Sequence, residues 1–124
     1  MMLTLPMPPN VANARGHWRT RYSAIQHWKM LALVQEKQLR GCRPFPTKVR
    51  IGATFYVGKH PKWMMDEDNC TARLKTVLDF LREMELLVND DPAHVTLDKP
   101  TQQVGSPRRV VLTLEPVAQN GAIS

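Results

Sequence analysis

The sequence predicts one α/β domain, more closely an α+β domain, in which two helices pack on a single mixed sheet. The chain has 124 residues, of which 43% are hydrophobic and 23% are charged, and these values are typical of one folded domain. Short stretches of alternating polarity predict strands, and two longer stretches with apolar residues at helical spacing lie between them. The predicted order is therefore β-α-β-α-β-β.

The N-terminal part is expected to form a strand, a basic loop and a helix. The stretch MLTLP, residues 2–6, alternates apolar and polar residues and stops at the PMPPN breaker. An irregular loop is expected next, and its arginines are Arg15, Arg19 and Arg21. From Ser23 to about Leu39, apolar residues recur at helical spacing before a glycine and a proline end the run.

The middle of the chain is expected to form a strand that leads directly into a second helix. Residues 48–57, KVRIGATFYV, alternate as a strand does, with every second side chain apolar. The acidic stretch MMDEDN follows within a few residues. Asp68 and Asn69 are both good N-caps, so the helix is expected to begin just after them and to end near LLVNDDP, residues 86–92.

Two further strands are expected at the C-terminal end of the domain. Residues 94–103 and 108–117 both have strand patterns, and Gly105, Ser106 and Pro107 between them predict a hairpin turn. The domain is therefore expected to span residues 1–117, followed by a polar tail at residues 118–124.

The charge of the chain is distributed unevenly. The net charge is +6, yet residues 1–63 contain 11 basic residues and one acidic residue, whereas residues 64–124 contain six basic and ten acidic ones. This distribution fits a protein that binds a polyanion and brings a cation site up to it, although basic residues that only solvate the surface are an equally good explanation of the charge alone.

Several function classes receive no support from the sequence. The two cysteines fit neither a metal-ligand spacing nor a disulfide framework, and no paired histidine spacing, nucleophile elbow or Gly-rich phosphate loop is present. We therefore expect no nucleotide cofactor. No apolar run is long enough for a signal peptide or a membrane span, so we expect a cytoplasmic protein with no membrane role.

The acidic stretch predicts a divalent-cation site. Asp66 and Asp68 flank one residue where a strand meets a helix, and strand alternation would send both carboxylates to the same side. If the next strand pairs beside residues 48–57, Asp90 or Asp91 could join them, and three oxygen ligands suit Mg²⁺ or Mn²⁺ bound together with a substrate phosphate. The alternative is that these acidic residues only cap a helix and form a turn.

Two more residues have both a functional and a structural interpretation. Lys75 lies nearly two helical turns after Asp68, where it could hold a phosphate or stabilise a leaving group, or form an ion pair with Asp79. Trp18 lies among the N-terminal arginines and could stack on a base or a sugar, although a tryptophan beside an amphipathic helix is more often a packing anchor.

The order of three motifs resembles a known family. LTLPMPPN near the N-terminus, MDEDNCTARLKTVLDFL in the centre and LLVNDDPAHVT after it occur at the approximate spacing of the RusA family of Holliday-junction resolvases, small endonucleases common in bacterial phages and prophages. The similarity covers about residues 3–115.

The resemblance implies a specific activity. RusA-like proteins form homodimers, use Mg²⁺ or Mn²⁺, and nick two opposed strands of four-way branched DNA symmetrically during recombination and repair. The matching metal-binding acids would be Asp66, Asp68 and one of Asp90 and Asp91, of which we favour Asp91. Lys75 would correspond to the active-site lysine of the family.

The sequence also departs from the family pattern. In the best-known form of the family the lysine follows the second aspartate by four residues, whereas Ala72 occupies that position here and Lys75 lies three residues further. Two methionines stand where basic residues can precede the first aspartate. Phosphate contacts would then come from these residues instead: Lys59, Lys62 and the loop with Arg15, Arg19 and Arg21.

Overall fold

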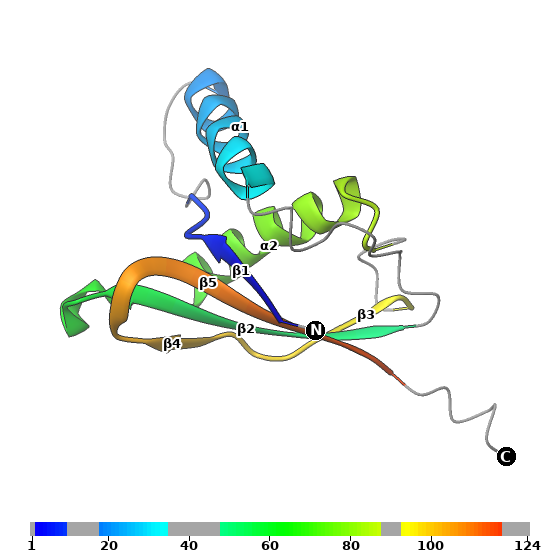
Figure 1. Ribbon diagram of the computed structural model, residues 1–124. Coiled ribbons are helices and arrows are strands. Elements are labelled where there is room, and N and C mark those ends of the chain that lie inside the picture. Colours follow the sequence, from blue (N-terminus) through cyan, green and yellow to red (C-terminus); the bar gives the residue numbers. More distant parts are fainter. Residues whose placement is uncertain (1, 10–17, 35–47, 88–92, 118–124) are drawn as a thin grey trace, which may run out of the picture.

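A five-stranded mixed sheet with two helices on one side forms the part of the protein that the computed structural model describes, residues 2–9, 18–34, 48–87 and 93–117 (Figure 1). The strands are β1 (Met2–Pro6), β2 (Val49–Gly58), β3 (Val95–Leu97), β4 (Thr101–Gln103) and β5 (Gly105–Pro116). The helices are α1 (Trp18–Val34) and α2 (Glu67–Glu83), and a 3-10 turn, η2 (Pro61–Trp63), precedes α2. The predicted α+β class is confirmed, and the third of the four predicted strands, residues 94–103, is divided into β3 and β4.

Strand β2 lies at the centre of the sheet. It pairs antiparallel with β5 along one edge and parallel with β3 and β4 along the other, and β1 pairs antiparallel with the far edge of β5. Residues 98–100 separate β3 from β4; there Asp98 donates its backbone N–H to the carbonyl of Ile51 and accepts a 2.9 Å hydrogen bond from Arg50. The condition set above, that the strand after residues 89–91 pairs beside residues 48–57, is therefore met, and the pairing is parallel.

The hairpin expected around Gly105 is wrong. β4 and β5 do not pair with each other, because β2 lies between them and hydrogen-bonds to both. The chain instead passes around the end of β2, where Gly105 pairs with Gly58 across a bulge in the ladder. Gly105 is the first residue of β5 and Pro107 lies within this strand, but the local sequence does not reveal which strand β4 or β5 will pair with.

The core lies between the helices and one face of the sheet. Alternate residues of β2, from Val49 to Val57, are buried, as are Leu3 and Leu5 of β1 and Val110, Leu112 and Leu114 of β5. From α2, the buried side chains include Leu74, Val77, Leu78, Phe80 and Leu81. The opposite face of the sheet presents polar and charged residues such as Arg50 and Thr113, so helices cover one face only.

Helix α1 begins earlier than the sequence predicted. The structure places Trp18, Arg19 and Arg21 in α1 rather than in a loop, and the reason is that no glycine or proline interrupts the chain between Trp18 and Val34. Within its expected apolar stripe, Trp28 and Ala32 are buried but Leu31 is 46% exposed. The expected extension to Leu39 lies outside the described residues.

Trp28 is the main anchor of α1. Its indole Nε1 donates a 2.9 Å hydrogen bond to the backbone carbonyl of Pro6, and its ring makes an edge-on contact with Phe80 at 5.4 Å between centroids. The same side chain therefore connects α1 with the end of β1 and with α2. A 2.6 Å ion pair between Lys29 and Glu83 also joins the two helices.

Helix α2 begins two or three residues before the predicted position. Asp66, not Asp68 or Asn69, is the N-cap, and its carboxylate accepts a 2.7 Å hydrogen bond from the backbone N–H of Asn69. The sequence offers an aspartate at both positions, and only the backbone conformation selects between them. The helix ends at Glu83, after which Glu85 adopts a left-handed conformation with φ 62°.

Replacing Trp28 should destabilise the fold. We expect Trp28→Ala to lower the free energy of unfolding by about 3–5 kcal/mol, because it removes a buried aromatic side chain and leaves the Pro6 carbonyl without its donor. Urea denaturation would measure the loss. Tyr22→Ala on the same helix, where the side chain is 59% exposed, should change the free energy by about 0.5 kcal/mol or less. Equal losses in the two variants would contradict the assignment of Trp28 as the anchor.

Candidate functional site

The start of α2 is held against β4 by one side chain. The amide of Gln102 accepts a 2.6 Å hydrogen bond from the backbone N–H of Met65 and donates a 2.7 Å hydrogen bond to the Met65 carbonyl. Together these bonds fix the residue directly before the N-cap, much as a neighbouring strand would. Asp66 is therefore positioned by β4 as well as by its own helix.

The predicted acidic residues lie in the first turn of α2. Asp66 and Asp68 are both exposed, and Glu67 between them is 3.6 Å from Lys99. Asp66 is the N-cap and Asp68 is the second residue of α2, so the two aspartates do not alternate along a strand as predicted. Within the part of the chain described, no three carboxylate, histidine or cysteine side chains are grouped as a metal site.

The third predicted acid, Asp90 or Asp91, lies outside the described residues, so its place in a metal site stays a prediction. The described residue before it, Leu87, follows the C-terminal end of α2, whereas Asp66 caps the N-terminal end. A helix of 17 residues is about 25 Å long. The two acidic stretches are thus attached to opposite ends of α2.

Lys75 lies on the exposed surface of α2. The ion pair with Asp79 that we considered as its structural role is not formed, because the Asp79 carboxylate is 3.7 Å from Arg82 instead. Its assignment as a phosphate or leaving-group contact stays a prediction.

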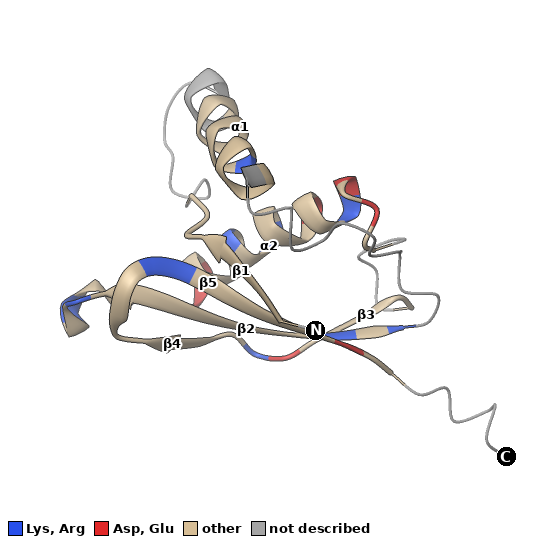
Figure 2. Ribbon diagram, viewed as in Figure 1, with Lys and Arg blue, Asp and Glu red and all other residues tan. Residues whose placement is uncertain are grey.

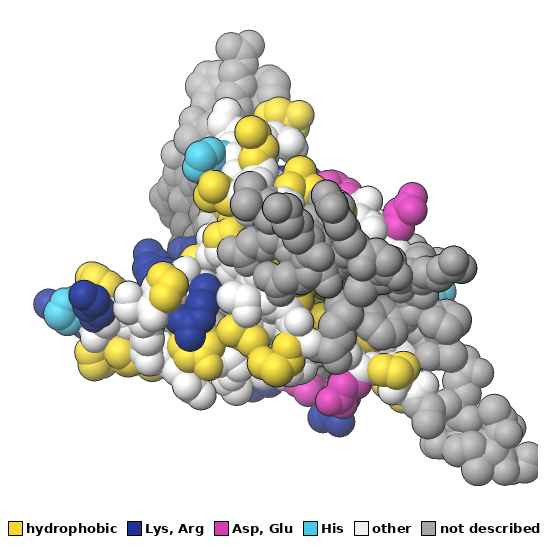
Figure 3. Space-filling model, viewed as in Figure 1, with side chains coloured by type: hydrophobic (Ala, Val, Ile, Leu, Met, Phe, Trp, Pro, Cys, Tyr) yellow, Lys and Arg dark blue, Asp and Glu magenta, His cyan; other side chains and the backbone are white. Residues whose placement is uncertain are grey.

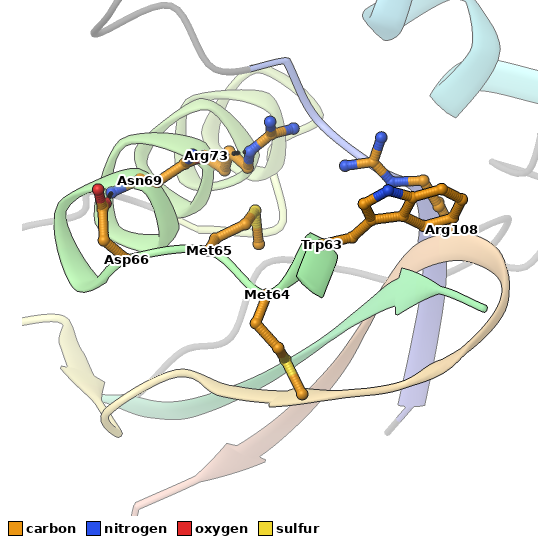
Figure 4. A pocket seen from close by; sticks show the side chains of 7 residues that line it. All are labelled: Trp63, Met64, Met65, Asp66, Asn69, Arg73 and Arg108. Atoms are coloured by element: carbon orange, nitrogen blue, oxygen red, sulfur yellow. Dashed lines mark hydrogen bonds between the residues drawn. The ribbon is translucent and has the colours of Figure 1, made fainter. Parts of the chain in front are cut away.

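A pocket of about 400 Å³ opens beside Asp66 (Figure 4). Its lining residues come from the turn after β2, from α2 and from β5, and they are Trp63, Met64, Met65, Asp66, Asn69, Arg73 and Arg108. Of these, only Asp66 was predicted as a site residue. The pocket thus combines one predicted carboxylate with two arginines, Arg73 and Arg108, that sequence reasoning missed.

Arg73 is held in a fixed position on α2. Its Nε donates a 2.7 Å hydrogen bond to the side chain of Asn69, and its Nη1 donates to the carbonyl of Pro8. Burial lowers the pKa of the Arg73 guanidinium, and the like charge of Arg108 lowers the pKa further. Because an arginine stays protonated in proteins, the pair concentrates positive charge in the pocket.

The turn after β2 adds exposed cations and an aromatic ring. Lys59 and Lys62, both predicted to contact DNA, are exposed. Figure 2 shows basic residues on the turn at the end of the sheet, and Figure 3 shows basic side chains gathered on this side of the molecule. Trp63 is 46% exposed and makes an edge-on contact with His60 at 4.7 Å between centroids. The two lysines are therefore close to the pocket residues in the sequence, one and four residues before Trp63.

A second hollow of about 300 Å³ continues from this pocket toward α1. Arg73 and Arg108 line both hollows, and the remaining walls are largely apolar: Met7, Pro8, Pro9, Ala24, His27, Trp28 and Leu31. The arginines thus stand at the junction of two neighbouring depressions rather than in an isolated one.

The remaining predicted DNA contacts are on or before α1. Arg15 lies outside the described residues. The backbones of Trp18, Arg19 and Arg21 belong to the first turn of α1, and their contacts with DNA stay predictions.

Cys70 has a structural position at the start of α2. It is buried in the core, and burial is the main cause that raises the pKa of its thiol; Arg73 lowers the pKa in part, and Asp66 and Glu67 raise it. A thiol in these surroundings stays protonated near neutral pH and packs as a small apolar group. The structure therefore gives no nucleophilic role to Cys70.

A scan against protein families matches none of them, and a search of curated proteins finds no significant match. The resemblance to RusA-like resolvases therefore stays a prediction. In the described ranges, no helix is both long enough and apolar enough to cross a lipid bilayer.

The backbone at the end of β2 determines where Trp63 lies. Gly58 has φ +109°, and a Cβ atom built there would lie 2.7 Å from Cε3 of the Trp63 ring. We expect Gly58→Ala to lower the free energy of unfolding by about 1–3 kcal/mol, because the backbone is strained for an L residue and the indole must move. Urea denaturation would measure this loss.

Gly52→Ala is a matched control for this substitution. The new Cβ would lie 2.7 Å from Oγ1 of the exposed Thr113 side chain, which can rotate away, and at an ordinary contact distance of 3.6 Å from Oδ2 of Asp98, so we expect a loss below about 1 kcal/mol. A Gly58→Ala variant as stable as Gly52→Ala would show that Gly58 does not determine the position of Trp63.

Proposed function

We propose that this protein is a metal-dependent endodeoxyribonuclease that acts on branched DNA. The observation that supports the proposal most directly is the pocket that places Asp66 beside Arg73 and Arg108. Hard oxygen ligands next to a positively charged pocket suit an enzyme that hydrolyses a phosphodiester, because one part holds a cation and the other holds the substrate's phosphates.

The exposed carboxylates fit a divalent cation such as Mg²⁺ or Mn²⁺. Mg²⁺ is commonly held by one or two carboxylates together with water and substrate phosphate oxygens, and Asp66 and Asp68 supply two carboxylates at the start of one helix. A bound cation would lower the pKa of a coordinated water and neutralise charge on the scissile phosphate. On the resemblance to RusA-like enzymes, Asp90 or Asp91 would be a further ligand.

The residues of the chain itself would orient the DNA. The guanidinium groups of Arg73 and Arg108 can each donate two hydrogen bonds to one phosphate, and Lys59 and Lys62 can neutralise neighbouring phosphates. Asp66 has one carboxylate oxygen in the helix cap, which fixes the orientation of the other oxygen. Lys75 would stabilise the departing 3′ oxygen, as the family resemblance implies.

The choice of a four-way junction as substrate rests on the resemblance to RusA-like resolvases. A four-way junction has two-fold symmetry, so paired symmetric nicks require two equivalent active sites, and a homodimer would provide them. The enzyme would then serve recombination and repair in the cytoplasm of a bacterial cell.

One observation favours an alternative function, a DNA-binding protein that cuts slowly or not at all. The described residues supply only two carboxylates that are free of other ion pairs in the acidic stretch, and Ala72 stands where the family's best-known form has its lysine. The cationic pocket would bind DNA equally well in such a protein.

Asparagine substitutions separate the two functions. Asp66→Asn and Asp68→Asn should each reduce the rate of junction cleavage in Mg²⁺ by at least about 100-fold while they preserve or strengthen DNA binding, because each removes a metal ligand and a negative charge near phosphates. Asparagine is itself a good N-cap, so Asp66→Asn should leave α2 intact. Cleavage of labelled junctions and fluorescence anisotropy would measure the two effects.

Glu67→Gln is the matched control, because it removes a carboxylate from the same turn where the side chain faces Lys99 rather than the pocket. This variant should cut at nearly the rate of the unaltered protein. Undiminished cleavage by both asparagine variants, or an equal loss in Glu67→Gln, would argue against Asp66 and Asp68 as metal ligands.

A further inference from the structure

Trp63 is a large aromatic side chain held at the surface by its neighbours. Its indole packs over Gly58, whose missing side chain leaves the space for the ring, and it contacts His60 edge-on. Even so, 46% of the residue remains exposed. The exposed part of the indole provides a flat apolar surface for a ligand.

Positive charge surrounds this indole. The aliphatic part of Arg108 lies against the same side of Gly58, with Cγ 3.3 Å from the position that a Cβ atom would occupy. Arg73 lines the same pocket from α2, and its guanidinium is close enough to Arg108 for their charges to repel. Among the residues that the structure describes, no carboxylate forms an ion pair with either arginine. Asp66 lines the same pocket but forms no ion pair with either arginine, so both guanidinium groups can still bind an anion.

The shape of the pocket fits a small planar ligand joined to an anion. Its volume of about 400 Å³ lies in the range of pockets that bind small molecules. Met64 and Met65 complete the wall with flexible thioether side chains that can adapt to different ring systems. A nucleotide has both parts, a base with an exposed π-face and a phosphate.

We propose that the pocket between Trp63, Arg73 and Arg108 binds one unpaired nucleotide of DNA, with the base stacked on the indole of Trp63 and its phosphate held by the two guanidinium groups. This inference rests on the proposed action on DNA and adds the structural feature that the site recognises. In a regular duplex both faces of each base are covered by neighbouring base pairs, so this pocket selects DNA in which a base is unstacked.

Binding measured without metal tests the proposal independently of cleavage. The probe is a fluorescein-labelled single-stranded oligodeoxythymidylate of about ten nucleotides, titrated in EDTA and followed by anisotropy. Trp63→Leu keeps an apolar side chain but removes the ring, and it should weaken binding about tenfold. Trp63→Phe keeps a ring and should bind within about threefold of the unaltered protein.

An oligonucleotide of the same length that has abasic sites in place of every base identifies the stacking contribution. It should bind the unaltered protein and Trp63→Leu equally, because no base is present to stack. Unchanged affinity of Trp63→Leu for the thymidylate probe, or an equal loss on the abasic probe, would overturn the proposal.

Charge-matched variants test the phosphate contact. Arg108→Gln should weaken binding of both probes and reduce the dependence of affinity on salt, whereas Arg50→Gln, on the uncovered face of the sheet, should leave both nearly unchanged. Equal effects of the two arginine variants would show that only the overall charge of the protein affects binding, and this result would overturn the proposed phosphate contact in the pocket. If binding depends on the Trp63 ring but the protein never cuts DNA, the proposed nucleotide pocket is supported and the proposed nuclease activity is refuted.

Discussion

The arrangement of the candidate site depends on β2, the strand that carries β5 on one edge and both β3 and β4 on the other. The chain therefore passes the C-terminal end of β2, near Gly58, more than once. The turn η2, the start of α2 and the beginning of β5 consequently meet beyond Gly58. The bulge between Tyr56 and Gly58 and the left-handed conformation of Gly58 redirect the chain at this point, and they leave space for Trp63.

Polar contacts at this end of the sheet hold charged side chains near one another although they are far apart in the sequence. Gln102 fixes the backbone at Met65, so Asp66 begins α2 at a defined place beside β4. One helical turn further, Asn69 and Pro8 hold Arg73 in the pocket that Arg108 enters from β5. The Asp66 carboxylate and the Arg73 guanidinium are thereby oriented before any ligand arrives, and such preorganisation reduces the entropy lost on binding.

The sequence predicts where the strands and helices lie in the chain better than it predicts which strands pair with one another. The alternation in residues 48–57 specifies β2 almost to the residue, because every second side chain is buried. Asp66 and Asp68 are equally good caps by composition, so the start of α2 was misplaced. The hairpin at Gly105 was wrong because strand pairing is decided across the sheet, not by the turn. Arg73 and Arg108 were missed for the same reason: neither belongs to a local motif, and only the crossing at the end of β2 brings them together.

The most direct test is cleavage of a labelled synthetic four-way junction by the purified protein, in Mg²⁺ and in EDTA, beside a linear duplex of the same sequence. If the acidic start of α2 and the cationic pocket form one nuclease site, the protein will cut the junction in Mg²⁺, leave it intact in EDTA and spare the duplex. Paired symmetric nicks would also identify a resolvase. Tight binding to the junction without cleavage, in Mg²⁺ and in Mn²⁺ alike, would contradict the nuclease and return Asp66 to the single role of a helix cap.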